Sequence, residues 1–397
     1  MTTSTAQPPT SPRPEALGLL PEDPRRTRTR VDPFPFTPWL RWLLRLLLAL
    51  PYVAASFVTS ALGVSAGHPN DLEAERVAAI DWTRADVGWV ADLYPPVGTL
   101  VSTLVTRVIP LGELGLSLLG ALAGGYFLQK ILEATTQREL RWTTRLLFLV
   151  GIAYNPFTFA LVTEDALLFL SIGFFLLGTQ ELVRFLYWSS TRDGFRAGNL
   201  LMLSALTDPL GLAFVVVAGI AALFYVPDDL ERPGRRRASM LVALFPTMGA
   251  FSTFLFLMWA FGGLDVAAIA ATLDGTGDRF LEVIELGRSP RGLLLFLATA
   301  LAWILAAVER RARSIVFSIV AIVIYYIAIV LGIGEDATGA GIWLMVYSLV
   351  ALFVRRARTP AALVTITTVA VLAIPIVWVA ALLNPTVHAW WVALLGS

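Results

Sequence analysis

The sequence predicts an all-α fold, a polytopic bundle of about ten transmembrane helices with short helices in its external loops. Hydrophobic residues make up 57% of the 397 residues, charged residues only 15%, and the mean hydropathy is +0.72. An ordinary soluble domain carries about 25% charged residues. The apolar residues also fall into blocks of about 18 to 25, the length that a helix needs to cross a bilayer core of about 30 Å.

Residues 1–33 are predicted to be a disordered tail, because they are rich in Pro, Thr, Ser and Arg and have no apolar period. The first apolar run begins near Trp39 and lacks the small-residue cleavage site of a signal peptide, so we expect a retained first span. The positive-inside rule places the tail in the cytoplasm, and we expect the protein in the plasma membrane. The arginines that precede or open this span are Arg25, Arg26, Arg28, Arg30, Arg41 and Arg45.

Residues 34–397 are predicted to form one transmembrane domain with two external loops, at 65–96 and 263–291. The first loop is acidic, which suits the external face. Its carboxylates are Asp71, Glu73, Glu75, Asp81, Asp86 and Asp92. Nine further apolar segments follow, near 112–129, 146–162, 166–187, 199–226, 239–262, 292–308, 314–333, 340–354 and 361–383.

The charged connections disagree about the topology at one point. Counting spans forward from the N-terminus places Arg235–Arg237 outside, whereas counting backward from the later basic loops places them inside. The segment 199–226 is the predicted source of the miscount, because Thr207-Asp208-Pro209 interrupts it and both Asp and Pro are unfavourable inside a continuous span. A broken or re-entrant helix is expected there, and the alternative is one long tilted span that violates the charge rule.

Acidic residues just beyond the first span are the leading candidates for chemistry. A carboxylate at a membrane surface can take the proton from an acceptor hydroxyl, or help to hold a divalent cation such as Mg²⁺ or Mn²⁺ against a phosphate. Asp71 lies only a few residues beyond the span and is the first choice, whereas Asp81 and Asp92 are weaker ones. The alternative is a solvated acidic loop, because charged side chains mostly lie in water.

Two proline corners flank further candidates. Tyr94-Pro95-Pro96 is predicted to form a rigid return of the first loop, because each proline fixes φ and restricts the residue before it. Asn155-Pro156-Phe157 ends a span early, and Glu164 and Asp165 follow at the expected start of the next helix. These two acids either stabilise that helix terminus electrostatically or join Asp71 in one external cavity.

These features resemble the GT-C superfamily of integral membrane glycosyltransferases, with the actinobacterial mannosyltransferase-like group as the nearest type. The pattern comprises the acidic first loop, the Tyr-Pro-Pro corner before Val97-Gly98-Thr99-Leu100, the Asn-Pro break, and Asp208-Pro209-Leu210-Gly211-Leu212, and it covers about residues 40–230. The resemblance implies transfer of a sugar from a polyprenyl-phosphate donor, with a first-loop acid, Asp71 or Glu73, as catalytic base. Relatives often carry a basic residue where this chain has Asp208, which allows a non-catalytic member.

The second loop offers two candidate phosphate ligands, Arg288 and Arg291. Arginine binds phosphate through bidentate hydrogen bonds, and the alternative role is snorkelling at the membrane interface. Asp274–Arg279 resembles a calcium loop only superficially, because the other ligand positions are missing, so a flexible turn is expected. Trp142, Trp343, Trp390 and Trp391 lie near predicted span ends and are assigned to the interfacial aromatic belt.

Composition excludes several other functions. The chain has no cysteine and only two histidines, His68 and His388, which excludes thiolate chemistry and makes a multi-histidine metal site improbable. The balance of 30 basic and 29 acidic residues argues against a nucleic-acid partner, and no nucleotide-binding loop is present. Lys130 is the only lysine among 30 basic residues, a bias that indicates a GC-rich genome. The expected location is therefore an actinobacterial cell envelope.

The sequence is also compatible with two competing functions. One is a lipid-glycan transporter, flippase or assembly scaffold on a similar frame, in which Asp208 beside Pro209 would act at a broken helix. The other is a peptidoglycan polymerase of the shape-and-division type, which is disfavoured because its large external loop comes late in the chain.

Overall fold

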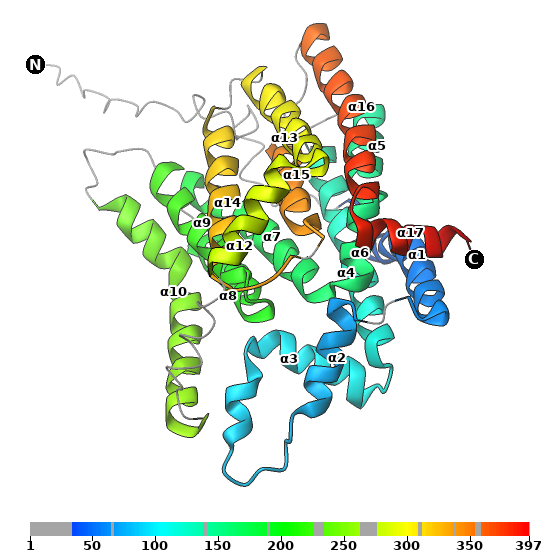
Figure 1. Cartoon of the computed structure of the whole chain (residues 1–397). Helices are drawn as coiled ribbons and strands as arrows, with labels where there is room; N and C mark the ends of the chain where they lie inside the picture. Colours follow the sequence, from blue (N-terminus) through cyan, green and yellow to red (C-terminus); the bar gives the residue numbers. More distant parts are fainter. Residues whose placement is uncertain are drawn as a thin grey trace, which may run out of the picture.

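The computed structural model describes residues 34–64, 67–137, 141–188, 191–225, 234–262, 276–308, 312–336, 338–353 and 359–396. In these ranges the secondary structure is helical and contains no strand (Figure 1). The first half comprises α1 (Pro38–Leu62), α2 (Pro69–Ala79), η2 (Gly88–Leu93), α3 (Pro96–Thr103), η3 (Leu104–Val108), α4 (Gly112–Gln137), α5 (Trp142–Ala153), α6 (Pro156–Glu164) and α7 (Ala166–Trp188). The second half comprises α8 (Thr191–Thr207), α9 (Gly211–Tyr225), α10 (Arg235–Leu257), η4 (Met258–Gly262), α12 (Thr276–Arg288), α13 (Pro290–Val308), α14 (Ala312–Val330), α15 (Ala340–Phe353), α16 (Pro360–Leu382) and α17 (Pro385–Gly396).

Seven of the described helices are long and apolar enough to cross a membrane, namely α1, α4, α7, α10, α13, α14 and α16. The pair α5–α6 passes the same test together but is bent by 58°. This bend lies at the predicted Asn-Pro corner, where the Asn155 side chain caps α6 by accepting a hydrogen bond of 2.9 Å from the backbone N–H of Phe157. The prediction of a multi-pass helical membrane protein is therefore confirmed at this level.

Proline and glycine explain much of the local geometry. Proline in the first turn suits a helix, because its fixed φ is helical and its missing N–H costs nothing there. Among the described helices, seven begin with proline, at Pro38, Pro69, Pro96, Pro156, Pro290, Pro360 and Pro385. Glycine allows close helix contacts. The Cα of Gly125 on α4 lies against the carbonyl of Arg45 on α1, and Gly120 lies against the carbonyl of Val162 on α6, so a Cβ at either position would clash with backbone.

The segment 199–226 is two helices that form a hairpin. Ser204, near the end of α8, exchanges hydrogen bonds of 2.9 and 3.0 Å with Ser171, near the start of α7. Phe214, near the start of α9, stacks on Phe175 of α7 with ring centroids 4.9 Å apart. The chain therefore reverses direction at Asp208, as the predicted interruption required, and the alternative of one long tilted span is wrong. Because the hairpin adds a reversal, α10 begins at the end of the bundle where α8 also begins, which removes the conflict over Arg235–Arg237.

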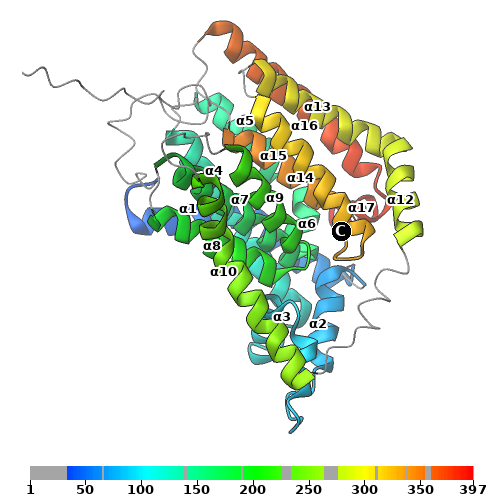
Figure 2. The same ribbon diagram turned by 90° about the vertical axis from the view of Figure 1, so that its left-hand side faces the viewer.

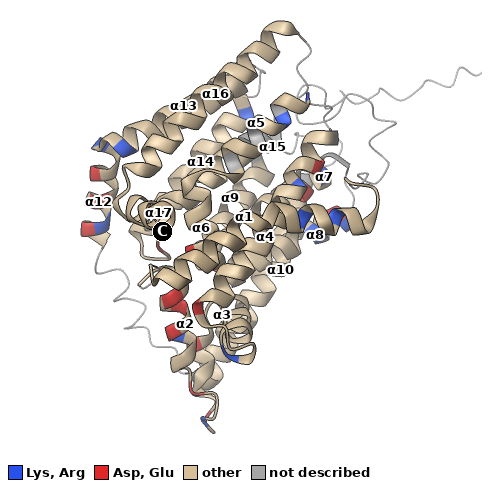
Figure 3. Cartoon of the chain, turned by 90° about the vertical axis from the view of Figure 1, so that its right-hand side faces the viewer, with Lys and Arg blue, Asp and Glu red and all other residues tan. Residues whose placement is uncertain are grey.

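The two ends of the bundle differ in charge. We call one the arginine end after its basic residues, which include Arg41, Arg45, Arg145, Arg184 and Arg196. The helices α1, α5 and α8 begin at this end, and α7 finishes there. We call the other the carboxylate end, where α6, α8 and α14 finish and α7, α9 and α15 begin; its acids include Glu73, Glu164, Asp165, Asp208 and Asp336. In Figure 3 red residues gather on and beside α2, away from the blue residues at the beginning of α8.

The segment α2–α3 covers the carboxylate end. Figures 1 and 2 show α2 and α3 beyond that end of the bundle, and α17 lying crosswise to α16. Gly98 on α3 contacts the backbone carbonyl of Thr207, so α3 rests directly on the break between α8 and α9. The ring of Tyr94 packs against Phe251 and Phe254 of α10. These contacts fix the predicted loop acids relative to the helix breaks.

Candidate functional site at the carboxylate end

Asn70 attaches α2 to the α6–α7 break. Its side chain is only 2% exposed. The amide nitrogen donates hydrogen bonds to the carbonyl of Thr163 at 2.8 Å and to the hydroxyl of Ser117 at 3.2 Å, and the amide oxygen accepts one from the backbone N–H of Ala166 at 3.0 Å. All of the polar atoms of a buried amide are thereby partnered. Asn70 thus places the neighbouring residues of α2 beside Glu164 and Asp165.

Three aspartates occupy helix starts at this end. Asp165 accepts a hydrogen bond from the backbone N–H of Leu168 at 3.3 Å, and Asp208 accepts one from that of Leu210 at 2.8 Å. Asp336 accepts from the backbone N–H groups of Gly341 and Ile342 at 3.0 and 3.3 Å. Asp165 and Asp336 therefore satisfy amides that a helix N-terminus leaves without an intrahelical partner, whereas Asp208 binds an amide of the turn just before α9.

Burial and mutual repulsion shift the ionisation of these aspartates. Burial raises the pKa of Asp208 to about 7, with the negative charges of Asp336 and Glu73 adding to the shift. Burial, then the charges of Asp208 and Asp336, raise the pKa of Asp165 well above its usual value. Burial also raises the pKa of Asp336, against the hydrogen bond of 2.7 Å that it accepts from the hydroxyl of Tyr325. Four acids from four chain segments thus lie within electrostatic range of one another, and we call Glu73, Asp165, Asp208 and Asp336 the acid cluster.

Arg76 holds Glu73 in the acid cluster. The two side chains form an ion pair on α2 at 2.7 Å. Arg76 also donates hydrogen bonds to the backbone carbonyl of Asp92 at 2.9 Å and to the hydroxyl of Thr99 at 2.6 Å. Asp92 thus contributes its backbone to this contact, and its own side chain is exposed. The guanidinium joins α2, η2 and α3 into one unit.

Asp71 lies on the other side of α2. Its carboxylate accepts a hydrogen bond of 2.8 Å from the backbone N–H of Gly67, as an acid in the first turn of a helix commonly does. It lies within electrostatic range of Glu113 on α4, as does Glu164. The structure therefore brings Glu73, rather than Asp71, to the acid cluster.

Tyr94 also reaches this region. Burial, then the charge of Asp208, raise the pKa of Tyr94, which places its ring near the α8–α9 break. Its hydroxyl is buried and has no hydrogen-bond partner in the described part of the chain.

The two candidate arginines of the second loop have different surroundings. Arg288, at the end of α12, is exposed. Arg291, in the first turn of α13, is half-buried and lies within electrostatic range of Asp336 and of the Tyr326 hydroxyl. Arg291 is therefore the one placed beside the acid cluster. Asp274 lies outside the described residues.

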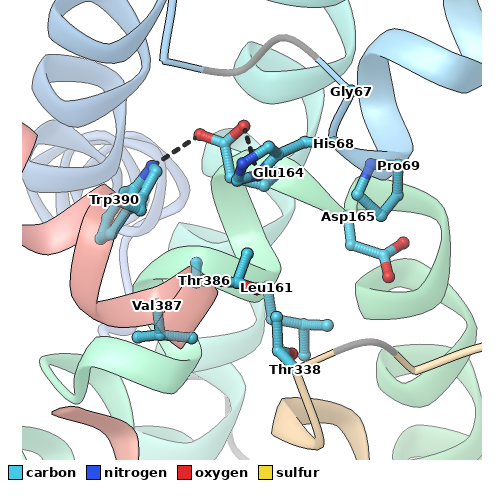
Figure 4. A pocket seen from close by; sticks show the side chains of 11 residues that line it. Gly67, His68, Pro69, Leu161, Glu164, Asp165, Thr338, Thr386, Val387 and Trp390 are labelled. Carbon is cyan, nitrogen blue, oxygen red and sulfur yellow. Dashed lines mark hydrogen bonds and ion pairs between the residues drawn. The ribbon is translucent and has the colours of Figure 1, made fainter. Parts of the chain in front are cut away.

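A cavity of about 210 Å³ opens beside the acid cluster. Glu164, at the end of α6 rather than at the start of the next helix, lies in its wall and is 3% exposed. One carboxylate oxygen accepts a hydrogen bond of 2.9 Å from the indole N–H of Trp390, and the other lies 3.6 Å from Nδ1 of His68 (Figure 4). Asp165, Thr338 and Thr386 complete the polar lining. The expected shared cavity thus contains both Glu164 and Asp165, and Asp71 is not among its lining residues.

Sequence reasoning missed several residues of this site, namely His68, Asn70, Arg76, Asp336 and Trp390. Trp390 and Trp343 were assigned to the interfacial belt, but they are 1% and 5% exposed, so that assignment is wrong for both. Trp142, at 64% exposure, remains compatible with it. Asn70 and Trp390 act on partners far along the chain, and no local pattern could indicate those contacts.

A metal site is not evident in the described part of the chain, where no three His, Asp or Glu side chains are placed to hold one ion. The fold and site define the class: a helical protein with at least seven helices able to cross a membrane and an acidic, partly buried site at one end of the bundle. No family model, curated protein or solved structure shows significant similarity to this chain.

Proposed function

We propose that this chain is a plasma-membrane glycosyltransferase of the GT-C type, which moves a sugar from a polyprenyl-phosphate donor to an envelope glycan, lipid or protein acceptor. The reaction would take place at the carboxylate end, on the external face, with the N-terminus in the cytoplasm. The α8–α9 hairpin would start and end on the cytoplasmic side, so α10 would begin there. Membrane lipids and the lipid-linked sugar are the partners that this activity requires.

One observation supports the proposal most directly. The acid cluster joins α2 to three helix breaks, and two arginines, Arg76 and Arg291, lie beside it. Sugar transfer from a lipid phosphate needs a carboxylate that takes a proton and a cation that holds the phosphate. It needs no soluble nucleotide-binding domain.

The geometry favours particular roles. Asp208 is proposed as the base, because a general base is most effective when its pKa is near the working pH. It would take the proton of the acceptor hydroxyl as that oxygen forms a bond to the anomeric carbon. The bond from this carbon to the phosphate oxygen breaks, and polyprenyl phosphate leaves with the bonding electrons. Arg291 is proposed to bind this phosphate, and the Glu73–Arg76 pair to position α2 against it.

The test compares Asp208→Asn with Asp71→Asn in nanodiscs supplied with a short-chain polyprenyl-phosphate sugar and an acceptor extract from the envelope. Asp208→Asn is expected to slow transfer about 10²- to 10⁴-fold, the usual contribution of a general base. Glu75→Gln, which removes an exposed carboxylate of α2, should leave transfer unchanged and serves as the control. Loss of activity in Asp71→Asn with normal activity in Asp208→Asn would move the base to Asp71, as the sequence resemblance first implied.

A lipid-glycan transporter or flippase is the second candidate. The observation that favours it is Asp208 at the α8–α9 break, because burial raises the pKa of this carboxyl to about 7 and it can therefore bind and release a proton near neutral pH. Proton-dependent exchange of a lipid-linked glycan in proteoliposomes, abolished by Asp208→Ala and unaccompanied by sugar transfer, would establish this function and refute the transferase.

A further inference from the structure

The cavity beside Glu164 contains a buried charge that lacks a full set of partners. Glu164 comes from α6, and one of its oxygens has no hydrogen-bond partner among the described residues. The nearest basic atom to that oxygen is Nδ1 of His68, at 3.6 Å, a separation beyond a normal hydrogen bond. A buried carboxylate oxygen without a donor is costly, so the site favours a ligand that supplies one.

The surroundings determine what kind of donor is favoured. Asp165 lines the same cavity, and the charges of Asp208, Asp336 and Glu73 all act on Asp165. On the other side, Glu113 lies within electrostatic range of Glu164. Arg76 pairs with Glu73, and Arg291 lies within electrostatic range of Asp336; neither arginine is among the residues that line the cavity. The field in the cavity is therefore negative, and it favours a positively charged donor over a neutral hydroxyl.

We propose that this cavity binds the ammonium group of a small organic cation, with the unpartnered oxygen of Glu164 accepting its hydrogen bond and the carboxyl of Asp165 supplying a second acceptor oxygen. Figure 4 shows the two carboxylates on adjacent residues, with Glu164 held between Trp390 and His68. The walls formed by Ala160, Leu161 and Val387 would contact the carbon skeleton of the ligand. An organic cation fits better than a metal ion, because these side chains provide no three-ligand set in the described residues. The inference goes beyond the proposed transferase, since binding requires no sugar transfer.

The test uses ethanolamine and its uncharged counterpart ethylene glycol as probes. Binding to the full chain in phosphatidylcholine nanodiscs is measured by ligand-observed NMR at pH 7. Ethanolamine is expected to bind and ethylene glycol to bind at least about tenfold more weakly, because hydrogen bonds to charged groups are the stronger ones. Glu164→Gln should weaken ethanolamine binding by about tenfold or more, whereas the matched control Glu75→Gln should not change it.

A second variant keeps the proposal testable if Glu164→Gln does not fold. Thr386 is exposed at the cavity and lines it, so Thr386→Trp would fill the opening and leave Glu164 in place. Loss of ethanolamine binding in this variant supports the proposal. Unchanged binding in both Glu164→Gln and Thr386→Trp, or equal binding of the two probes to the natural chain, would overturn it.

The lipid composition identifies the source of the ammonium group. If phosphatidylethanolamine in the nanodisc lowers the apparent affinity for ethanolamine, a lipid headgroup occupies the cavity. If the affinity is the same in both kinds of nanodisc, the natural ligand is a soluble amine. Both results leave the proposed transferase to its own assay, so failure of one proposal is distinguishable from failure of the other.

Discussion

Replacing Asn70 by alanine should release α2 from the bundle. The side chain makes three hydrogen bonds, to Thr163, Ser117 and Ala166. Its loss leaves the buried N–H of Ala166 without this partner, whereas the carbonyl of Thr163 still accepts a hydrogen bond from the hydroxyl of Ser117. At about 1 kcal/mol for each hydrogen bond, with a further penalty for unpaired buried groups, the expected cost is about 2 to 4 kcal/mol. The free energy of local opening of α2 and of the α6–α7 break should fall by this amount, because these are the segments that Asn70 joins.

Amide hydrogen exchange measures that local opening. A cost of about 2 to 4 kcal/mol corresponds to exchange of the α2 amides roughly 30- to 900-fold faster. Asn384→Ala is the matched control. Asn384 is also buried, at 1% exposure, and its side chain donates to the carbonyl of Thr338 at 3.0 Å and accepts from the N–H of Val387 at 3.1 Å. The control should accelerate exchange in α17 and leave α2 unchanged.

The result that would refute this reasoning is specific. If Asn70→Ala leaves α2 exchange unchanged while Asn384→Ala accelerates exchange in α17, then Asn70 does not attach α2, and the ion pair of Arg76 or the packing of α3 must hold it. The placement of Glu73 in the acid cluster would then lose its main support.

Three further predictions follow from other parts of the bundle. Asp208 has a folded-state pKa of about 7, above its unfolded value, so its contribution to stability is full below about pH 4 and is lost as the pH rises toward 7. The Asp208→Asn variant should therefore show a smaller change in unfolding temperature over this pH range than the natural chain. An unchanged slope would contradict the raised pKa. Gly125→Ala should lower the unfolding temperature, because a Cβ there meets the Arg45 carbonyl. Gly173→Ala on α7 should leave the unfolding temperature unchanged or raise it, because a Cβ there has no described atom within 4 Å. Equal effects of the two variants would refute the close contact of α1 and α4. Because the chain has no cysteine, Glu75→Cys should react with an impermeant maleimide on intact cells and Thr143→Cys only after permeabilisation, and the reverse pattern would invert the proposed topology.

The sequence predicted those parts of the fold that depend on local pattern. Apolar block length identified the long helices, and the Asn155-Pro156 and Asp208-Pro209 dipeptides identified two of the breaks. The sequence indicated an interruption in 199–226 but not its form, because hydropathy alone cannot distinguish an interrupted span from two short helices that reverse direction. Ser204 and Phe214 pack beside the same part of α7, and that contact exists only in three dimensions.

The site was predictable only in part, for a similar reason. Position just beyond a span pointed to Asp71, but which face of α2 each acid occupies depends on how Asn70 is fixed. Glu164 and Trp390 are 226 positions apart in the sequence, and their hydrogen bond reflects how α17 folds back across α6. Asp336 was not predicted as a site residue, because nothing nearby in the sequence links it to Asp165 or Asp208.

The acid cluster contains more charge than the helix termini require. Asparagine, serine or threonine could accept the same backbone hydrogen bonds at Asp165, Asp208 and Asp336 without mutual repulsion, since all of them cap helices well. The raised pKa of each aspartate shows that repulsion and burial make the charged state unfavourable in the folded chain. A purely structural role therefore explains the oxygen atoms at these positions and leaves the acid groups unexplained. A proton taken from an acceptor hydroxyl, or a cation drawn into the neighbouring cavity, would make use of that negative charge. Replacing all three aspartates by asparagine separates a structural role from a catalytic one, because it should preserve the backbone hydrogen bonds and stabilise the fold at neutral pH while abolishing transfer. Ammonium binding should only weaken in this variant, because Asp165 lines the cavity but Glu164 remains.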